Sequence, residues 1–216
     1  MKNYITSVLL SGVLLSPALE LQAGAYTATG QEQGLMRVSQ HAENGDIASQ
    51  YLFAMALHIK HDFANASHWF EKAAMQGHAS AQHYLGWAYQ NGKGVEQDYA
   101  VAAQWYSKAA AQDYILSLNN LGILYEKGLG VDQDLTKAKA CYSQAAHKGL
   151  ADAQYNLGLM YQYGKGGQKN EAEAVRWLSE AHKQLHRSGQ EQMKFVNSEE
   201  KHPEFHSGSK TLPSEI

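Results

Sequence analysis

Cysteine and proline are both rare in this chain, with one cysteine and three prolines among 216 residues. The single cysteine, Cys141, cannot close an internal disulfide, so the chain is not a small disulfide-stapled scaffold and no disulfide is predicted within it. Cys141 also lies far from the amino terminus, which excludes the processing site of a lipoprotein. The chain is therefore compatible with an oxidising compartment but gains no internal disulfide there.

An excess of charge of one sign is also lacking. Charged residues make up 18% of the chain, and the formal net charge is −3 at pH 7. A nucleic-acid-binding domain carries a basic patch, and binding to an anionic membrane surface needs a basic cluster. The sequence displays neither feature. We therefore predict no nucleic-acid partner and no attachment to a membrane surface.

Long hydrophobic runs are absent apart from one near the amino terminus, over residues 4–15. One positive charge precedes this run, and the small residues Ala23-Gly24-Ala25 follow it. These are the three parts of a secretory signal peptide, and the run is too short to span a bilayer. We predict that residues 1–25 are removed and that the chain is exported to the periplasm, with no membrane insertion after signal cleavage.

What the sequence does contain is an internal repeat with a period of 36 residues. Sliding the chain by one period lays Leu85-Gly86 on Leu121-Gly122 and then on Leu157-Gly158. Each copy reads as a helix, a glycine turn and a second helix, and such a period is typical of a helical solenoid. We predict an all-α solenoid with these divisions: signal peptide 1–25; linker and amino-terminal capping helix 26–45; units 46–77, 78–113, 114–149 and 150–185; and a largely disordered extension 186–216.

Positions within a unit indicate why the units stack. On a helical wheel, the residues around Leu85 form a stripe wide enough to be buried. Gly86 and its equivalents, Gly122 and Gly158, cost helix stability, so they predict a close approach between two helix backbones. In the second helices, small residues and tryptophans such as Trp105 are predicted to fill the gap between units. Four residues that precede second helices suit the N-cap position: Asp62, Asp98, Asp134 and Asn170.

These positions resemble the Sel1-like repeat, a relative of the tetratricopeptide repeat. The pattern Ala-x-Ala-Gln-x-x-Leu-Gly-x-x-Tyr-x-x-Gly-x-Gly-Val-x-x-Asp, followed by Ala-x-x-Trp-x-x-x-Ala-Ala, is met almost fully over residues 79–112. The resemblance covers about 140 residues and implies an α/α right-handed superhelix. The third and fourth units depart from the pattern at four positions: Leu118, Cys141, Gly167 and His182.

The resemblance also implies a class of function, because members of this family are generally adaptors. Exported bacterial members include regulators of periplasmic sensors, envelope-assembly scaffolds, host-contact factors and immunity proteins against delivered toxins. One subset carries two cysteines in each repeat. This chain lacks those cysteines, so the ligand preferences of that subset do not carry over.

Glycine loops such as Gly92-Lys93-Gly94 could be mistaken for phosphate-binding loops. A phosphate-binding loop follows a strand and aims a helix N-terminus at the anion. Here a helix is predicted on each side of every loop, and the loops recur with the period. They are therefore predicted to be turns.

Histidine and cysteine side chains offer other candidates for chemistry. His182 and His186 lie four residues apart on a predicted helix near Glu180, but two histidines do not complete a zinc site. His202 and His206 share this spacing across a proline. Cys141 stands in a tryptophan column expected to be buried, which predicts an unreactive thiol. We predict no catalytic residue, no metal site and no cofactor.

A more informative set of residues lies opposite the predicted core. On the wheel, His83 and Trp87 fall at about 160° and 200° from Leu85. We name this set, with its equivalents in the other units, the ladder: Tyr51, Met55, His83, Trp87, Asn119, Ile123, Tyr155 and Leu159. Aromatic and apolar residues on a face expected to be solvated predict a recognition surface. The alternative is that curvature presses the first helices together and half-buries the ladder.

The sequence thus predicts an exported, non-enzymatic module that binds a protein or peptide partner on its concave helix face. A narrower alternative is an immunity or inhibitor protein that neutralises a toxin in the periplasm. A third alternative is a hydrolase or metal-dependent enzyme of the envelope. It is disfavoured, because the sequence displays no convergent set of polar groups of the kind that builds an active site.

Overall fold

The structure is a computed structural model that describes residues 28–184. Within these residues all regular secondary structure is helical. No helix of this part is both long and apolar enough to cross a membrane. The predicted signal peptide and the extension 186–216 lie outside the described residues. The helices are α2 (Ala28–Glu43), α3 (Ile47–Ile59), α4 (Phe63–Met75), α5 (Ala79–Asn91), α6 (Tyr99–Ala110), α7 (Ile115–Lys127), α8 (Leu135–His147), α9 (Ala151–Tyr163) and a helix over residues 171–184.

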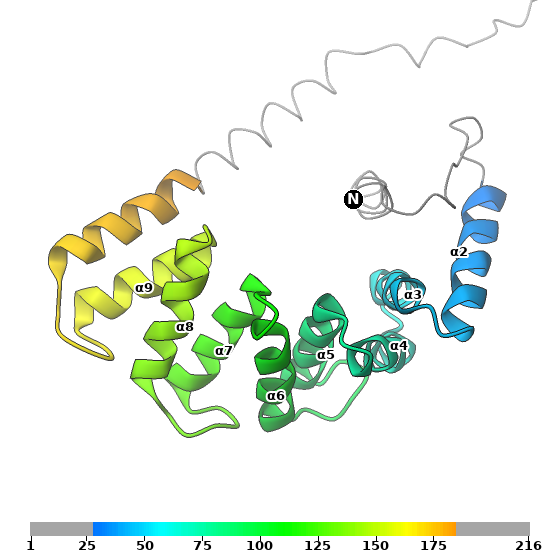
Figure 1. Cartoon of the computed structure of the whole chain (residues 1–216), viewed down its shortest axis with the longest axis horizontal. Coiled ribbons are helices and arrows are strands. Elements are labelled where there is room, and N and C mark those ends of the chain that lie inside the picture. Colours follow the sequence, from blue (N-terminus) through cyan, green and yellow to red (C-terminus); the bar gives the residue numbers. More distant parts are fainter. Residues whose placement is uncertain (1–27, 185–216) are drawn as a thin grey trace, which may run out of the picture.

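These helices pair into four helix-turn-helix units, and the units follow one another along an arc (Figure 1). The first helices of the units are α3, α5, α7 and α9, and the second helices are α4, α6, α8 and the helix over 171–184. The second helices α4, α6 and α8 pack on the first helix of the next unit, while α2 packs on α3 from the amino-terminal side. The prediction of an all-α repeat solenoid is confirmed.

The predicted N-caps are confirmed at all four second helices. Asp98 accepts hydrogen bonds from the backbone N–H groups of Ala100 and Val101, at 2.8 and 3.0 Å. Such a bond satisfies a backbone donor that has no partner within the helix, and replacing the cap with alanine typically costs about 1 kcal/mol. The other three second helices have equivalent caps: Asp62 with Asn65, Asp134 with Lys137, and Asn170 with Glu173.

The glycine loops are turns, as predicted. Their second glycine also allows neighbouring units to approach each other closely. Gly92 ends α5 in the left-handed conformation, with φ +62°. Gly94, two residues later, has φ +77° and lies against the backbone of Phe63 at the start of the second helix of the preceding unit. A side chain at Gly94 would overlap that backbone. The later loops repeat this contact, with Gly130 on Tyr99 and Gly166 on Leu135.

The helix glycines lie where close packing was predicted, and their neighbours include both side chains and helix backbone. A Cβ at Gly86 would lie 3.3 Å from the backbone oxygen of Ala102, and one at Gly158 would lie 3.2 Å from the backbone nitrogen of Leu178. A Cβ at Gly86 would lie 2.8 Å from the Tyr106 ring, and a Cβ at Gly122 would lie 2.7 Å from the Tyr142 ring. Both rings are fully buried. Trp105, which was predicted to fill the gap between units, is half-buried and packs against the core of the first and second units, with the Lys108 Nζ atom 3.9 Å from its ring centre. In the second unit the buried ring is therefore that of Tyr106, the residue after the tryptophan, whereas in the fourth unit Trp177 itself is buried.

Glutamine side chains form a second link between units. The Gln82 Nε2 atom donates to the backbone carbonyl of Ala74 at 3.1 Å, and the Gln82 Oε1 atom accepts from Gln112 at 2.8 Å. In the third unit Leu118 stands at the position equivalent to Gln82. Lys148 instead forms an ion pair with Asp113 of the preceding unit at 2.8 Å. The same arrangement joins Gln50 to Ala42 and Gln76, and Gln154 to Ala146 and Gln184. Since Ala42 belongs to α2, α2 takes the place of a second helix and caps the first unit.

Candidate functional site

The ladder lies along the first helices of all four units, but its exposure is uneven. His83 and Asn119 are each only 7% exposed, whereas Tyr155 is 50% exposed. The expectation of a solvated face is therefore wrong at His83 and Asn119. Adjacent first helices cover these two side chains, which is the alternative interpretation of the ladder. The remaining ladder residues are half-buried: Tyr51, Met55, Trp87, Ile123 and Leu159.

At the junction of the first and second units, aromatic rings fill the space around the ladder. The Tyr51 ring stacks on the His78 ring with centroids 4.5 Å apart. His58 meets the Trp87 ring edge-on at 5.1 Å. Such ring pairs add stability beyond the area that they bury. Tyr51 and Trp87 therefore contribute to packing between units.

His83 occupies the junction of the second and third units. Its Nδ1 atom lies 2.9 Å from the Ser117 Oγ atom, and its ring lies 5.0 Å from that of Tyr114. Ser117 is fully buried, so this histidine–serine pair is closed to a substrate. Burial lowers the pKa of His83 to about 4, which leaves the imidazole neutral at pH 7. The pair joins α5 to α7.

The burial of His83 predicts acid sensitivity. In the unfolded chain a histidine titrates near its ordinary pKa of about 6.5. Between that value and about 4 the unfolded state binds more protons than the folded state, so stability is complete above pH 6.5 and falls as pH decreases. We expect a loss of about 2–3 kcal/mol between pH 7 and pH 4 from this residue.

Urea denaturation at pH 7 and pH 4.5 tests this prediction, with His83→Gln as the comparison. Glutamine can still bond to Ser117 but does not titrate, while all carboxylates remain. The variant should lose distinctly less stability on acidification than the wild type. An equal loss in both proteins would show that His83 is not the acid-sensitive group.

At the junction of the third and fourth units the ladder opens into a pocket of about 380 Å³. Asn156 donates from Nδ2 to the Asn119 Oδ1 atom at 3.1 Å, which links α9 to α7. Asp152 and Tyr155 are exposed. We name this open surface depression the α7–α9 pocket. Its lining residues are Asn119, Ile123, Ala151, Asp152, Tyr155 and Asn156.

Three ladder residues thus meet at one pocket: Asn119, Ile123 and Tyr155. Asp152 and Asn156 were missed, because the prediction considered only the two ladder columns of each unit. The sequence did contain an indication of Asn156. Asn156 of the fourth unit stands at the position of Tyr84 in the second unit, so a small amide replaces an aromatic side chain there.

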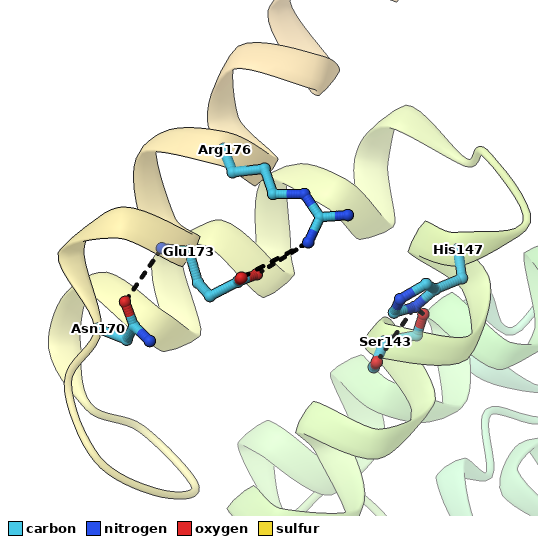
Figure 2. Close-up of polar contacts among 5 residues, drawn as sticks. All are labelled: Ser143, His147, Asn170, Glu173 and Arg176. Atoms are coloured by element: carbon cyan, nitrogen blue, oxygen red, sulfur yellow. Dashed lines mark hydrogen bonds and ion pairs between the residues drawn. The ribbon is translucent and has the colours of Figure 1, made fainter.

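The polar contacts near the end of the solenoid are local. Figure 2 shows Asn170 accepting from the backbone of Glu173, Glu173 paired with Arg176, and His147 bonded to Ser143. Each contact joins residues three or four positions apart. The His147 ring also meets the ring of Trp177 edge-on at 4.9 Å, which packs α8 against the last described helix. These contacts stabilise helices.

The other candidates for chemistry remain separate from the pocket. His182 is exposed, and His186, His202 and His206 lie outside the described residues. Between residues 28 and 184, no group of three or more His, Cys, Asp or Glu side chains could hold a metal ion. Burial raises the pKa of Cys141 to about 11, so the thiol is protonated at neutral pH.

Comparison with known proteins agrees with the repeat architecture. A protective antigen present in uropathogenic Escherichia coli strains, with an SLR fold, is 34% identical over 69% of this chain and 33% of its own, with a TM-score of 0.67. A Sel1 repeat protein from Oxalobacter formigenes is 28% identical over 70% of this chain and 64% of its own, also with a TM-score of 0.67. The chain thus spans about a third of the first protein and less than two thirds of the second. No curated protein matches it.

The family model of the Sel1 repeat matches four consecutive segments, residues 47–78, 79–114, 115–150 and 151–184. Members of this family are typically non-enzymatic scaffolds that mediate protein–protein interactions. The four matches leave no gap between residues 47 and 184 and cover most of the chain. This chain belongs to the Sel1 repeat family.

Proposed function

We propose that this protein is an exported, non-enzymatic adaptor that binds a protein or peptide partner through the exposed part of the ladder, at the α7–α9 pocket. The observation that carries the proposal is the half-exposed ring of Tyr155 beside that pocket. The next unit covers His83 and Asn119, and the other ladder residues are half-buried. Tyrosine is enriched among the residues that dominate binding energy at protein interfaces. The proposal therefore centres on the third and fourth units.

A binding role for Tyr155 predicts a selective effect of its removal. Tyr155→Ala should weaken capture of the partner from an envelope fraction by about tenfold, since truncating an interface tyrosine commonly costs about 1–2 kcal/mol. Its melting temperature should stay close to that of the wild type, because an exposed ring contributes little to the core. Quantitative mass spectrometry of the captured proteins measures the effect.

Met75→Ala is the matched control, because Met75 is 74% exposed on a second helix, α4. Its captured proteins should equal those of the wild type. Trp87→Ala is less suitable as a probe of binding, because Trp87 packs on His58 and its loss will also destabilise the fold. Equal capture by Tyr155→Ala and the wild type would contradict the proposed site.

Export is supported by the three-part leader sequence in residues 1–25. Expression of the full chain in a Gram-negative host is expected to yield a periplasmic protein that begins at Tyr26. Amino-terminal sequencing of the periplasmic fraction checks both the compartment and the cleavage site. Full-length protein confined to the cytoplasm would contradict this part of the proposal. Replacing apolar residues of the 4–15 run with charged ones should block processing.

A further inference from the structure

Three junctions join the first helices of successive units. The residues at equivalent positions differ from one junction to the next. At the first junction, the Tyr51 ring is covered by the His78 ring, 4.5 Å away. At the second junction, the His83 ring is covered by the Tyr114 ring, 5.0 Å away. Both covering residues are the N-cap of the next unit's first helix. Two aromatic rings thus meet at each of these junctions.

At the third junction both rings are replaced. The ladder position is Asn119, and the N-cap of α9 is Leu150. Instead of a ring pair, the structure has an amide–amide hydrogen bond from Asn156 to Asn119 and the open α7–α9 pocket. The chain fills the equivalent space with its own aromatic rings at the other two junctions. The pocket therefore occupies a place where this fold accommodates an aromatic ring.

The chemistry of the lining suits a ring beside a positive charge. Ile123 and Ala151 supply apolar surface, and the exposed Tyr155 ring offers a stacking partner. Asp152 is exposed at the same pocket and forms no ion pair with another described residue. Its carboxylate lies in the first turn of α9 and carries the only formal charge of the lining. A complementary ligand group there is a cation.

We propose that the α7–α9 pocket receives a tyrosine or phenylalanine side chain from a partner protein segment in which a lysine or arginine adjoins the aromatic residue. The aromatic side chain takes the place of the missing ring against Ile123 and Tyr155, and the basic side chain pairs with Asp152. This inference rests on the proposed function, since it specifies the partner's chemistry at the same site.

The probe is a seven-residue peptide, blocked at both ends, with one tyrosine followed by one lysine among glycines and serines. Titration into the isotope-labelled full chain should give saturable changes in backbone amide signals of residues 119–123 and 151–156. A peptide with alanine in place of tyrosine should bind about tenfold more weakly. A peptide with glutamate in place of lysine should also bind more weakly, because it places an anion beside Asp152.

Two variants locate the binding in the protein. Asp152→Asn should reduce the preference for the lysine peptide over the glutamate peptide, while Asp132→Asn, an exposed acid in the loop between α7 and α8, should leave it unchanged. Asn119→Tyr restores, at a residue that lines the pocket, the ring that Tyr51 provides at the first junction, and it should abolish binding by filling the pocket. Its circular dichroism and melting are compared with those of the wild type, and Asp152→Asn keeps the test valid if Asn119→Tyr fails to fold.

The inference would be overturned if the tyrosine and alanine peptides bound equally, or if no saturable changes occurred at these amides. It would also fall if Asp152→Asn and Asp132→Asn behaved alike. Failure of the inference is distinguishable from failure of the proposed function. If Tyr155→Ala loses its captured partner while the peptides do not bind, the adaptor role is supported and the partner has another chemistry. If the peptides bind but Tyr155→Ala captures as much partner as the wild type, the pocket binds this chemistry and the proposed partner site is wrong.

Discussion

Gly130→Ala is expected to lower the free energy of unfolding by about 3–5 kcal/mol, a large fraction of the stability of an ordinary domain. Gly130 has φ +68°, where a side chain is strained. Its Cβ would also overlap the backbone of Tyr99 and Ala100, which belong to the preceding unit. A backbone cannot move aside as a flexible side chain can, so the two units must separate. Urea denaturation followed by circular dichroism measures the loss.

Gly149→Ala is the matched control for Gly130→Ala. Gly149 also has a positive φ, +89°, but no atom lies within 4 Å of the position that its Cβ would take. This substitution therefore tests backbone strain alone and should cost about 1–2 kcal/mol. The difference between the two variants measures the close approach between units. Equal losses would show that the loop glycine matters only for its own conformation.

Tyr142→Ala is expected to lower the free energy of unfolding by about 3–5 kcal/mol, as large-to-small changes of buried aromatic residues do. Tyr142 is fully buried, and its ring faces Gly122 in the same unit. Its removal leaves a cavity that Gly122 cannot fill, because that residue has no side chain. Thermal and urea unfolding measure the loss.

Tyr142→Phe separates the ring from the hydroxyl. The hydroxyl donates to the Glu126 carboxylate at 2.9 Å, and Lys165 bonds to the same carboxylate at 2.8 Å. Burial opposes ionisation of Glu126, but these bonds outweigh it and lower its pKa. Removing the hydroxyl should cost only about 1–2 kcal/mol. If Tyr142→Phe cost as much as Tyr142→Ala, the hydrogen bond and not the ring would dominate.

N-caps were predictable because they depend on the local sequence. An N-cap such as Asp98 bonds to backbone groups two or three residues away, so its partner is fixed by spacing alone. The glycine turns follow the same logic, since a helix that ends in the left-handed conformation favours glycine at that residue. The prediction about Trp105 holds only in part, because Trp105 packs half-buried against the core between units while its neighbour on the same helix is fully buried. Only the packing shows that this neighbour is Tyr106.

The exposure of the ladder residues depends on the next unit and could not be predicted from one helix. A helical wheel places His83 opposite Leu85, which is correct as geometry within one helix. Its burial comes from Ser117 and Tyr114, which lie in the next unit. Tyr155 stands in the same column but remains half-exposed, since no first helix of a fifth unit follows it within residues 28–184. One column can thus be core in one unit and surface in another.

The sequence alone determined the period, the helix boundaries signalled by caps and glycine turns, and the all-α solenoid, because these depend on short-range spacing repeated four times. Only the tertiary structure decided which ladder residues are accessible and that a pocket lies between α7 and α9. That difference has a physical cause. The exposure of a side chain depends on the shape of the residue placed against it by the next unit. Asn119 and Asn156 stand where other units have aromatic residues, and both line the open pocket.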